Sequence, residues 1–379
     1  MKKSIVFVIE SLHLGGAEKS LVTLLQNLDY NLFDVELLTF HAGGFFSDLL
    51  PSEVQRIVVP FPKLSLIDRG VFKLKRFLNF KHYHNAQLFW PIVEKYFKAN
   101  EKRYDFAIAY NQGFSTYYTA KFLNANLKYT WLNTDYKSAG YNIAFDYPFY
   151  TNYNKVIVVS KEAEQSFKSV LSSIKKHLTI EVIKDITDKN IIQAQAEKPL
   201  KHSFNVSKIN ILSVGRLVSP KGFDLAVKAC SYLMKSGLNV NWYILGEGVE
   251  RSNLERQIKQ HHLEKHFILL GADSNPYPYM KACDIYVQTS LFEGLGLTVI
   301  EASYLNKPIV STNFPTVYGI LKDEETGLIA EMNAEAIAKK IERLITDKAL
   351  RETLVSNLEE QENTDKQVTL KQIDLLLNI

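Results

Sequence analysis

Two basic residues lie close together after an apolar run in the second half of the 379-residue chain. The run Ile209–Val214 predicts a buried strand, and Gly215, Arg216 and Lys221 follow it. In open α/β sheets, ligands bind beyond the carboxyl ends of the strands. Two cations placed there can converge on one phosphate group. Taken alone, the segment is also compatible with a solvated turn that binds nothing.

A glycine-rich segment follows a second predicted strand, Asp284–Gln288, and opens a helix. Glycines let the backbone approach a ligand, and a helix N-terminus points free N–H groups at it, which favours a phosphate. Glu293 precedes the glycines and Glu301 lies about one turn into the helix. Carboxylates are poor phosphate ligands but accept hydrogen bonds from hydroxyl groups. Phosphate and hydroxyl recognition at one place is more typical of a sugar nucleotide than of a simple nucleotide.

A third glycine segment, Gly15-Gly16-Ala17-Glu18, follows the first predicted strand and opens the first helix. It lacks the G-x-G-x-x-G spacing of dinucleotide-binding proteins, and no acidic residue ends the second strand, so NAD binding is disfavoured. No G-x-x-x-x-G-K-[ST] run occurs in the chain, which also disfavours a P-loop kinase or ATPase.

Short apolar runs that alternate with amphipathic stretches position these motifs. Strands separated by helices predict parallel β-α-β units. The predicted strands are Ser4–Glu10, Asp34–Phe40, Gln55–Val59, Asp105–Tyr110, Lys128–Leu132 and Lys155–Val159, then Ile209–Val214, Val240–Leu245, Phe267–Leu270, Asp284–Gln288 and Pro308–Ser311. The predicted fold is α/β, with two Rossmann-like, doubly wound domains facing a central cleft.

The chain is longer than the ~250–300 residues at which one hydrophobic core stops growing, so two domains are expected. The polar stretch 193–208, which contains Pro199, is a predicted linker. We therefore predict a first domain at residues 1–195 and a second at 196–365. Residues 366–379 are expected to form a helix that packs back toward the first domain.

The composition excludes several classes of protein. Hydrophobic residues make up 46% and charged residues 23%, which excludes wholesale disorder, and a net charge of +4 is too weak to indicate nucleic-acid binding. Cys230 and Cys283 lack metal-type spacing and are expected to be inert core thiols in a reducing compartment. Glu10 interrupts the first apolar run too early for a signal peptide, and no window is apolar over the ~20 residues of a membrane span. A cytoplasmic protein is expected.

Four motifs in the same order resemble the retaining glycosyltransferases of family 4, which have the GT-B fold. They are Gly215-Arg216-Leu217 with Lys221-Gly222, Leu245-Gly246-Glu247-Gly248, Glu293-Gly294-x-Gly296-Leu297 with Glu301, and the early Gly15-Gly16-Ala17-Glu18. The last is similar to the acceptor-side loop of many bacterial members. The resemblance spans roughly residues 5–330 and is most specific in the second half of the chain.

The resemblance implies a role for each motif. Arg216 and Lys221 would neutralise the donor diphosphate in place of a metal ion, Glu301 would bind the ribose, and Glu293 would hold hydroxyls of the transferred sugar. Neither a metal nor any other cofactor is expected. The remaining donor-binding residues implied by the resemblance are Gly16, Gly215, Gly246, Gly271, Ala272, Gly294, Leu295, Gly296, Leu297 and Thr298.

The chain departs from the family at one position. Many relatives carry a histidine, in a Trp-x-His-x-Asp-like context, that contacts the sugar and diphosphate. Here the stretch reads Trp131-Leu132-Asn133-Thr134-Asp135, with Asn133 at the histidine position. Asparagine can bind a sugar hydroxyl but cannot carry charge or relay a proton. Asp135 is a candidate for positioning the acceptor, and a structural cap is the alternative.

Basic and aromatic residues are concentrated in residues 62–104. Ten Lys or Arg against three acids give this segment +7, more than the whole chain carries. Basic charge beside aromatic rings predicts contact with an anionic membrane or a lipid-phosphate acceptor, with Lys73, Lys75 and Arg76 as candidate contacts. The alternative is an ordinary helix pair with core aromatics and solvated lysines. Single-stranded RNA binding uses similar chemistry, but the other motifs do not support a nucleic-acid partner.

Together these observations predict a metal-independent enzyme that moves a hexose, with UDP-hexose favoured as donor, to a lipid-linked glycan acceptor. The resemblance also implies that the anomeric configuration is retained through front-face attack by the acceptor hydroxyl, with the departing phosphate as base, a route that requires no protein nucleophile. The setting would be capsule, O-antigen or exopolysaccharide synthesis at the cytoplasmic face of the inner membrane. The alternatives are a transferase with a soluble or protein acceptor, and a nucleotide-sugar-binding partner protein without turnover.

Overall fold

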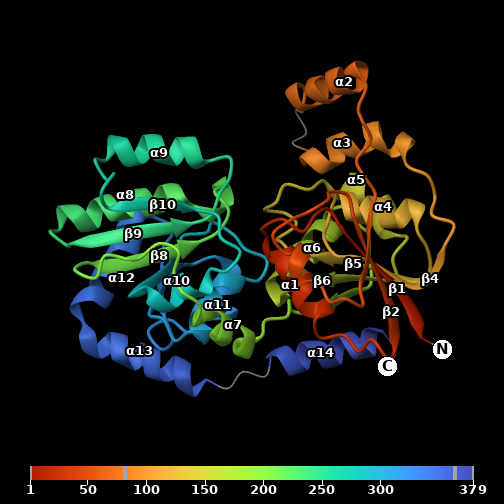
Figure 1. The fold of residues 1–379 in the computed structure, drawn as a ribbon. Coiled ribbons are helices and arrows are strands. Elements are labelled where there is room, and N and C mark those ends of the chain that lie inside the picture. The colour runs from red at the N-terminus through yellow and green to blue at the C-terminus, as the bar shows by residue number, and fades with distance from the viewer. Residues whose placement is uncertain (1, 80–82, 362–364, 378–379) are drawn as a thin grey trace. The chain divides into compact units, whose positions relative to one another are not determined.

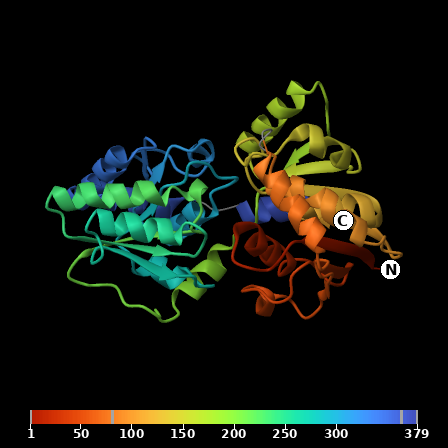
Figure 2. The same cartoon turned by 90° about the horizontal axis from the view of Figure 1, so that it is seen from above.

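The computed structural model describes residues 2–79, 83–361 and 365–377. The chain forms two compact units, residues 1–186 with 365–379 and residues 187–364 (Figure 1 and Figure 2). Each unit contains one parallel β-sheet with its own connecting helices. None of the helices formed by the described residues has the length and apolar composition to cross a bilayer.

The first unit contains a sheet of order β3-β2-β1-β4-β5-β6-β7 whose neighbouring strands are all parallel. Its strands are β1 (Lys3–Ile9), β2 (Phe33–Thr39), β3 (Gln55–Val58), β4 (Arg103–Ala109), β5 (Asn124–Leu132), β6 (Lys155–Val158) and β7 (Ile180–Val182). Its α-helices are α1 (Gly16–Leu25), α2 (Leu66–Phe77), α3 (Asn85–Val93), α4 (Phe114–Phe122), α5 (Ile143–Tyr150), α6 (Lys161–Ser173) and α14 (Asp365–Leu376). Short 3-10 turns occur at Ser47–Leu49 and Glu94–Tyr96.

The second unit contains a sheet of order β10-β9-β8-β11-β12-β13, again parallel between neighbours. Its strands are β8 (Ile209–Val214), β9 (Val240–Leu245), β10 (Phe267–Gly271), β11 (Ile285–Gln288), β12 (Ile309–Thr312) and β13 (Leu328–Ala330). Its α-helices are α7 (Lys189–Ala196), α8 (Phe223–Lys235), α9 (Arg251–Gln260), α10 (Tyr277–Ala282), α11 (Leu297–Tyr304), α12 (Ala334–Thr346) and α13 (Lys348–Glu360). Short 3-10 turns occur at Ser219–Lys221 and Pro315–Gly319.

Helices cover both faces of each sheet, so side chains on both faces of the central strands are buried. The strands are accordingly rich in apolar residues. In the second unit, Trp242 and Ile211 are fully buried with residues of α8 and α12. In the first unit, Trp90 of α3 packs its ring against Phe114 at a centroid distance of 5.1 Å, inside an aromatic core. Much of the aromatic content of residues 62–104 is therefore core packing, as the alternative interpretation of that segment predicted.

The predicted α/β fold with two doubly wound sheets is confirmed. Two strands, β7 and β13, were absent from the prediction. The boundary between the units also differs from the predicted 195/196, since it falls between residues 186 and 187. Helix α7 belongs to the second unit because its residues bond there: Gln193 Nε2 donates to Tyr304 O at 3.3 Å, and Gln195 O accepts from Asn275 Nδ2 at 3.0 Å.

Helix α14 belongs to the first unit, although it is separated from that unit in sequence by the whole second unit. Gln372 Nε2 of this helix donates to Val182 O of β7 at 3.1 Å. Tyr129 OH of β5 donates to Leu376 O at 3.1 Å. The C-terminal helix thus packs against the first sheet, where it bonds to strands β5 and β7.

Candidate functional site

The strand order of the second unit places two of the sequence motifs side by side. Strands β8 and β11 are parallel neighbours in the middle of the sheet, although they are not consecutive in the chain. The order of the strands reverses at this point, and ligands of doubly wound sheets bind at such switch points. The segments 215–222 and 289–296 follow these two strands, so both predicted binding segments lie at the same sheet edge.

The centre of this edge is an ion pair between Lys221 and Glu293. Lys221 Nζ lies 2.6 Å from Glu293 Oε1, and the side chains are 19% and 14% exposed. The same carboxylate oxygen accepts hydrogen bonds from Ser290 Oγ at 2.6 Å and Gln288 Nε2 at 2.9 Å. Three donors therefore hold Glu293 Oε1 in a fixed place. Glu293, which the sequence analysis assigned to the sugar, is thus in contact with Lys221, which it assigned to the diphosphate.

Gln288, the last residue of β11, links this pair to the first turn of α11. Its Oε1 accepts from Thr298 Oγ1 at 3.0 Å and from Tyr286 OH at 2.9 Å. Burial raises the pKa of Tyr286, so its hydroxyl stays protonated as a donor. Gln288 and Ser290 were not among the predicted site residues. The only signal in the sequence was their polar type at the end of an apolar strand.

The loops that follow β8 and β11 are joined through Gly222. Gly222 has φ +61°, and a Cβ added there would lie 2.1 Å from Thr289 O. Thr289 Oγ1 donates to Lys221 O at 2.8 Å, and Leu291 N donates to Pro220 O at 2.8 Å. Since only glycine permits this approach, the residue directly after Lys221 determines where that lysine sits.

The ends of β9 and β10 pack against the same loop. A Cβ on Gly246 would lie 1.9 Å from Gly215 O, so the backbones of these two segments touch. Gly246 N donates to Gly271 O at 2.8 Å, and Ala272 follows directly in the chain. The structure thus places the predicted donor-binding residues Gly215, Gly246 and Gly271 together, at the ends of the adjacent strands β8, β9 and β10.

Helix α11 begins at Leu297, directly after Gly296, and its first turn lies beside the ion pair. Gly294 and Leu295 are buried, whereas Leu297 and Thr298 are partly exposed. Glu301 is 2% exposed within the same helix. Arg216 is exposed, and among the described residues no hydrogen bond or ion pair joins its side chain to Lys221 or Glu293.

In the first unit, Asn133 lies in a cluster at the carboxyl ends of the strands. Asn133 Nδ2 is 3.4 Å from Asp185 Oδ1, which also accepts from Ser20 Oγ of α1 at 2.7 Å. Ser20 Oγ is in turn 2.9 Å from Tyr110 OH. Burial raises the pKa of Asp185 to about 6, against the opposing effect of the Ser20 and Asn133 hydrogen bonds. Asp185 follows a strand that the sequence pattern did not reveal, so its place in this cluster was not predicted.

The Gly15–Gly16 segment forms the start of α1 next to this cluster. A Cβ on Gly15 would lie 2.0 Å from Glu18 Oε2, so the glycine leaves room for that carboxylate. Burial, and then the charge of Glu18, raise the pKa of Glu10 to about 7. Gly16 is the first residue of the helix. Glu10 and Asp185 therefore hold their protons more readily than ordinary carboxylates.

The predicted acceptor and membrane residues lie elsewhere in the first unit. Asp135 Oδ1 accepts from Ser138 N at 2.6 Å and caps a local turn. Lys73, Lys75 and Arg76 are exposed on α2. Phe80 and Lys81, which the sequence counted in the same basic and aromatic segment, lie outside the described residues.

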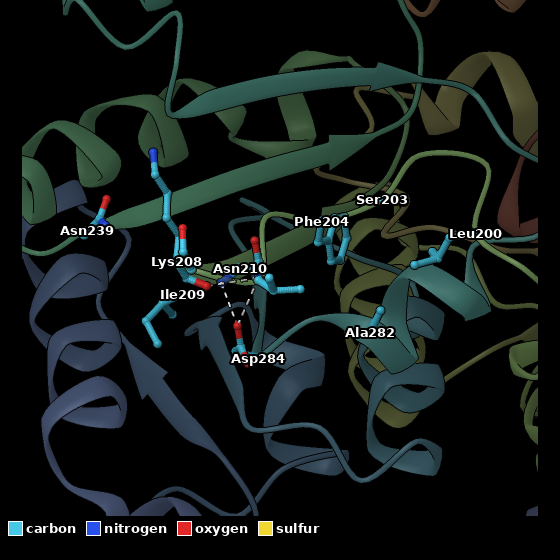
Figure 3. A pocket seen from close by; sticks show the side chains of 11 residues that line it. Leu200, Ser203, Phe204, Lys208, Ile209, Asn210, Asn239, Ala282 and Asp284 are labelled. Carbon is cyan, nitrogen blue, oxygen red and sulfur yellow. Dashed lines mark hydrogen bonds between the residues drawn. The ribbon is translucent and has the colours of Figure 1, made fainter.

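A separate hollow of about 720 Å³ lies at the opposite edge of the second sheet. Figure 3 shows its lining, which includes Phe204 and residues at the beginnings of β8 and β11. There Asp284 Oδ2 accepts from Asn210 N at 2.7 Å, so this carboxylate is used within the fold. In the part of the chain that the structure describes, no group of three or more His, Cys, Asp or Glu could hold a metal ion.

Comparison with solved structures defines the class of the fold as GT-B. The structure of Anabaena HepE in complex with UDP and glucose matches over 100% of both chains, with a TM-score of 0.74 and 16% identity. Sucrose-phosphate synthase from Thermosynechococcus elongatus matches with a TM-score of 0.72 and 17% identity, over 100% of this chain and 99% of the other. The expected GT-B fold is confirmed.

The sequence match is concentrated in the second unit. Residues 194–361 match the model of the family "Glycosyl transferases group 1". A Campylobacter jejuni N-acetylgalactosamine-N,N'-diacetylbacillosaminyl-diphospho-undecaprenol 4-alpha-N-acetylgalactosaminyltransferase is 36% identical over 37% of this chain and 38% of its own length. The Staphylococcus aureus capsular polysaccharide biosynthesis glycosyltransferase CapM is 30% identical over 45% of this chain and 44% of its own length. The aligned part thus covers less than half of these relatives.

Proposed function

We propose that the protein is a retaining, metal-independent glycosyltransferase of bacterial surface-polysaccharide synthesis. Its donor would be a nucleotide sugar, with UDP-hexose favoured, and its acceptor a lipid-linked glycan. The observation that carries this proposal is the Lys221–Glu293 pair beside the first turn of α11, at the switch point of a GT-B domain. A cation, a carboxylate and a helix N-terminus at one place suit a ligand with both phosphate and hydroxyl groups.

In this proposal, donor binding exchanges the partners within the ion pair. The diphosphate takes the ammonium group of Lys221, with Arg216 as a second cation. Glu293, released from the lysine but still held by Ser290 and Gln288, accepts hydrogen bonds from sugar hydroxyls. Buried Glu301 would meet the ribose. The backbone at the ends of β8, β9 and β10 would bind the remaining phosphate and base atoms.

Catalysis would then be electrostatic. Departure of the nucleoside diphosphate builds negative charge on a phosphate oxygen, and fixed cations and helix N–H groups stabilise that charge where it develops. The acceptor hydroxyl attacks the face that the phosphate leaves, and the departing phosphate takes its proton. Neither a protein nucleophile nor a metal ion is needed for this route.

The acceptor assignment is supported by the names of the relatives. One of them acts on a diphospho-undecaprenol substrate and others are named for capsule and lipopolysaccharide core synthesis. By analogy, we propose that this chain works at the cytoplasmic face of the inner membrane. Asn133 would contact the transferred sugar through hydrogen bonds alone, and Asp135 would border the acceptor.

A second candidate function is a nucleotide-sugar-binding protein without turnover. It is favoured by Asn133, whose amide is directed to Asp185 and which cannot carry charge. The two candidates differ in one measurement, transfer of labelled hexose to a lipid-linked acceptor. Transfer by the wild type eliminates the second candidate.

A thermal-shift screen against UDP, GDP and their sugar conjugates tests the donor site that both candidates share. Ligands that bind only the folded state stabilise it by RT ln(1 + L/Kd), where L is the free ligand concentration, so the midpoint of unfolding rises with the ligand concentration and the affinity. We expect UDP and UDP-hexoses to stabilise the wild type, and Lys221→Met to remove most of this shift. Stabilisation by neither base would contradict the donor-site assignment.

A further inference from the structure

Helix α2 of the first unit turns its apolar side away from the protein. The helix lies over α3 at the edge of the unit (Figure 1). Its apolar residues recur at helical spacing and form one stripe. Their side chains are exposed as follows: Leu66 84%, Ile67 78%, Val71 38%, Leu74 57% and Phe77 83%, with Leu78 directly after the helix at 48%.

The opposite side of α2, which contains an aspartate, attaches the helix to the unit. Asp68 is 6% exposed, and its carboxylate accepts hydrogen bonds from Lys95 Nζ at 2.8 Å, from Ser65 Oγ at 2.7 Å and from Tyr96 OH. These donors hold the pKa of Asp68 well below its usual range, so the anchor stays charged.

One turn further on, on the same side of the helix as Asp68, Phe72 packs its ring on Phe89 of α3 at a centroid distance of 5.2 Å. The polar anchor and this aromatic contact hold α2 with its apolar stripe outward. An ordinary surface helix has the reverse arrangement, because burying apolar area is what stabilises its attachment.

Basic residues border the exposed stripe on both sides. On a helical projection, Lys75 lies next to one border of the stripe. Lys73 lies next to the other border, and Arg69 and Arg76 lie further round the helix on that same side. All four basic residues are exposed. This pattern is typical of helices that lie in the plane of a membrane interface, with the apolar side among acyl chains and the cations at the headgroups. A two-fold contact between two copies of this stripe would bring the basic borders together, so charge favours anionic lipid as the occupant.

We propose that α2 inserts its apolar stripe into the interface of an anionic bilayer and so holds the first unit at the membrane. The inference rests on the proposed function in that a lipid-linked acceptor would be presented there. It goes beyond contact of Lys73, Lys75 and Arg76 with headgroups, because most of the attachment would come from buried apolar area. Binding should therefore weaken with salt but persist in part when the charges are screened.

Flotation of the full chain with vesicles of phosphatidylcholine, with or without phosphatidylglycerol, tests the proposal. We expect binding to the anionic vesicles, and a loss of roughly tenfold or more in Leu66→Ser/Phe77→Ser. The matched control is Val206→Ser/Leu375→Ser, which replaces two apolar side chains that are 98% and 65% exposed away from α2. The control should bind like the wild type. Equal binding of the two double variants would overturn the proposal.

A second readout distinguishes insertion from surface attraction. A Phe77→Trp variant should shift its fluorescence emission to shorter wavelength on anionic vesicles, whereas Val206→Trp should not, against an unchanged background from the buried Trp90, Trp131 and Trp242. No shift at position 77 would overturn insertion. If the wild type fails to bind vesicles, but forms a dimer that Leu66→Ser/Phe77→Ser dissociates, a second copy covers the stripe and the proposal fails.

The donor site is measured separately, by stabilisation with UDP-hexose. A wild type that binds UDP-hexose but no vesicles contradicts the membrane inference alone. A wild type that binds vesicles but no nucleotide sugar contradicts the proposed function alone. Leu66 and Phe77 lie outside the unit that holds the donor site, so their replacement should leave UDP binding unchanged.

Discussion

A single added methyl group at Gly222 would disturb the candidate donor site. A Cβ there would lie 2.1 Å from Thr289 O, whereas real contacts of this kind stay beyond 3.0 Å, so the two loops would separate by about an ångström. The left-handed φ of +61° adds strain of about 1 kcal/mol for a residue with a side chain. Overpacking adds ~1–3 kcal/mol, and weakening of the two hydrogen bonds that join the loops adds ~1 kcal/mol. We therefore expect Gly222→Ala to lower the free energy of unfolding by about 3–5 kcal/mol.

Gly237→Ala is the matched control for this prediction. Gly237 also has a left-handed φ, +78°, but a Cβ there would meet nothing within 4 Å. It should therefore lose only the strain, about 1 kcal/mol. Urea unfolding followed by circular dichroism measures both variants, and a thermal shift with UDP-hexose should be diminished only in Gly222→Ala, because Lys221 is displaced. Equal losses of stability in the two variants would refute the close approach of the two loops.

Three further predictions follow from the site. Lys221→Met should weaken UDP-hexose binding by roughly 10- to 100-fold in calorimetric titration, the value of a charge-assisted hydrogen bond, and unchanged affinity would exclude the lysine from the diphosphate site. Asp185→Asn should remove a loss of stability that the wild type shows as the pH rises from about 4 to 7. Burial raises the pKa of Asp185 in the folded state to about 6, above its ordinary value of 3.8, so the folded state binds the proton more tightly. The folded state therefore loses up to roughly 3 kcal/mol of stability as that proton dissociates. Parallel pH profiles of urea unfolding for the two proteins would contradict this. Added EDTA should leave hexose transfer unchanged, and a loss that Mg²⁺ or Mn²⁺ restores would contradict the metal-independent route.

The central strands could be predicted because both of their faces are buried. The run Ile5–Ile9 is apolar without alternation, and Ile209–Val214 is interrupted only by the buried polar residues Asn210 and Ser213. The three-residue strands β7 and β13 could not be found this way. Each is defined by its hydrogen bonds to one neighbouring strand, β6 or β12, and three residues carry no periodic signal.

The candidate site was predictable to the level of which segments meet, but not of which atoms meet. The family resemblance assigned Lys221 and Glu293 to one donor site, and the structure shows the adjacent strands β8 and β11 that bring them together. The hydrogen bonds from Gln288 and Ser290 to Glu293 depend on side-chain rotamers within one turn, which the sequence does not specify. The position of Asp185 next to Asn133 depends on the placement of β7, a strand that was itself not predicted.

The orientation of α2 was equally outside the reach of the sequence. Periodicity indicates that the helix has an apolar side and a charged side, but the usual rule places the apolar side inward. Asp68 reverses that rule, because Lys95, Tyr96 and Ser65 supply partners for a buried carboxylate. Those partners lie in the turn at the helix start and in the separate segment after α3, and only the folded chain brings them to one place.

The anomeric configuration of the product tests the central claim most directly. The wild type would be incubated with a UDP-α-hexose and a lipid-linked glycan acceptor, and the new linkage would be assigned by proton NMR. Front-face transfer at the Lys221–Glu293 site predicts an α-linked product whose formation Lys221→Met suppresses. A β-linked product, or transfer that continues undiminished in that variant, would contradict the proposed site and mechanism.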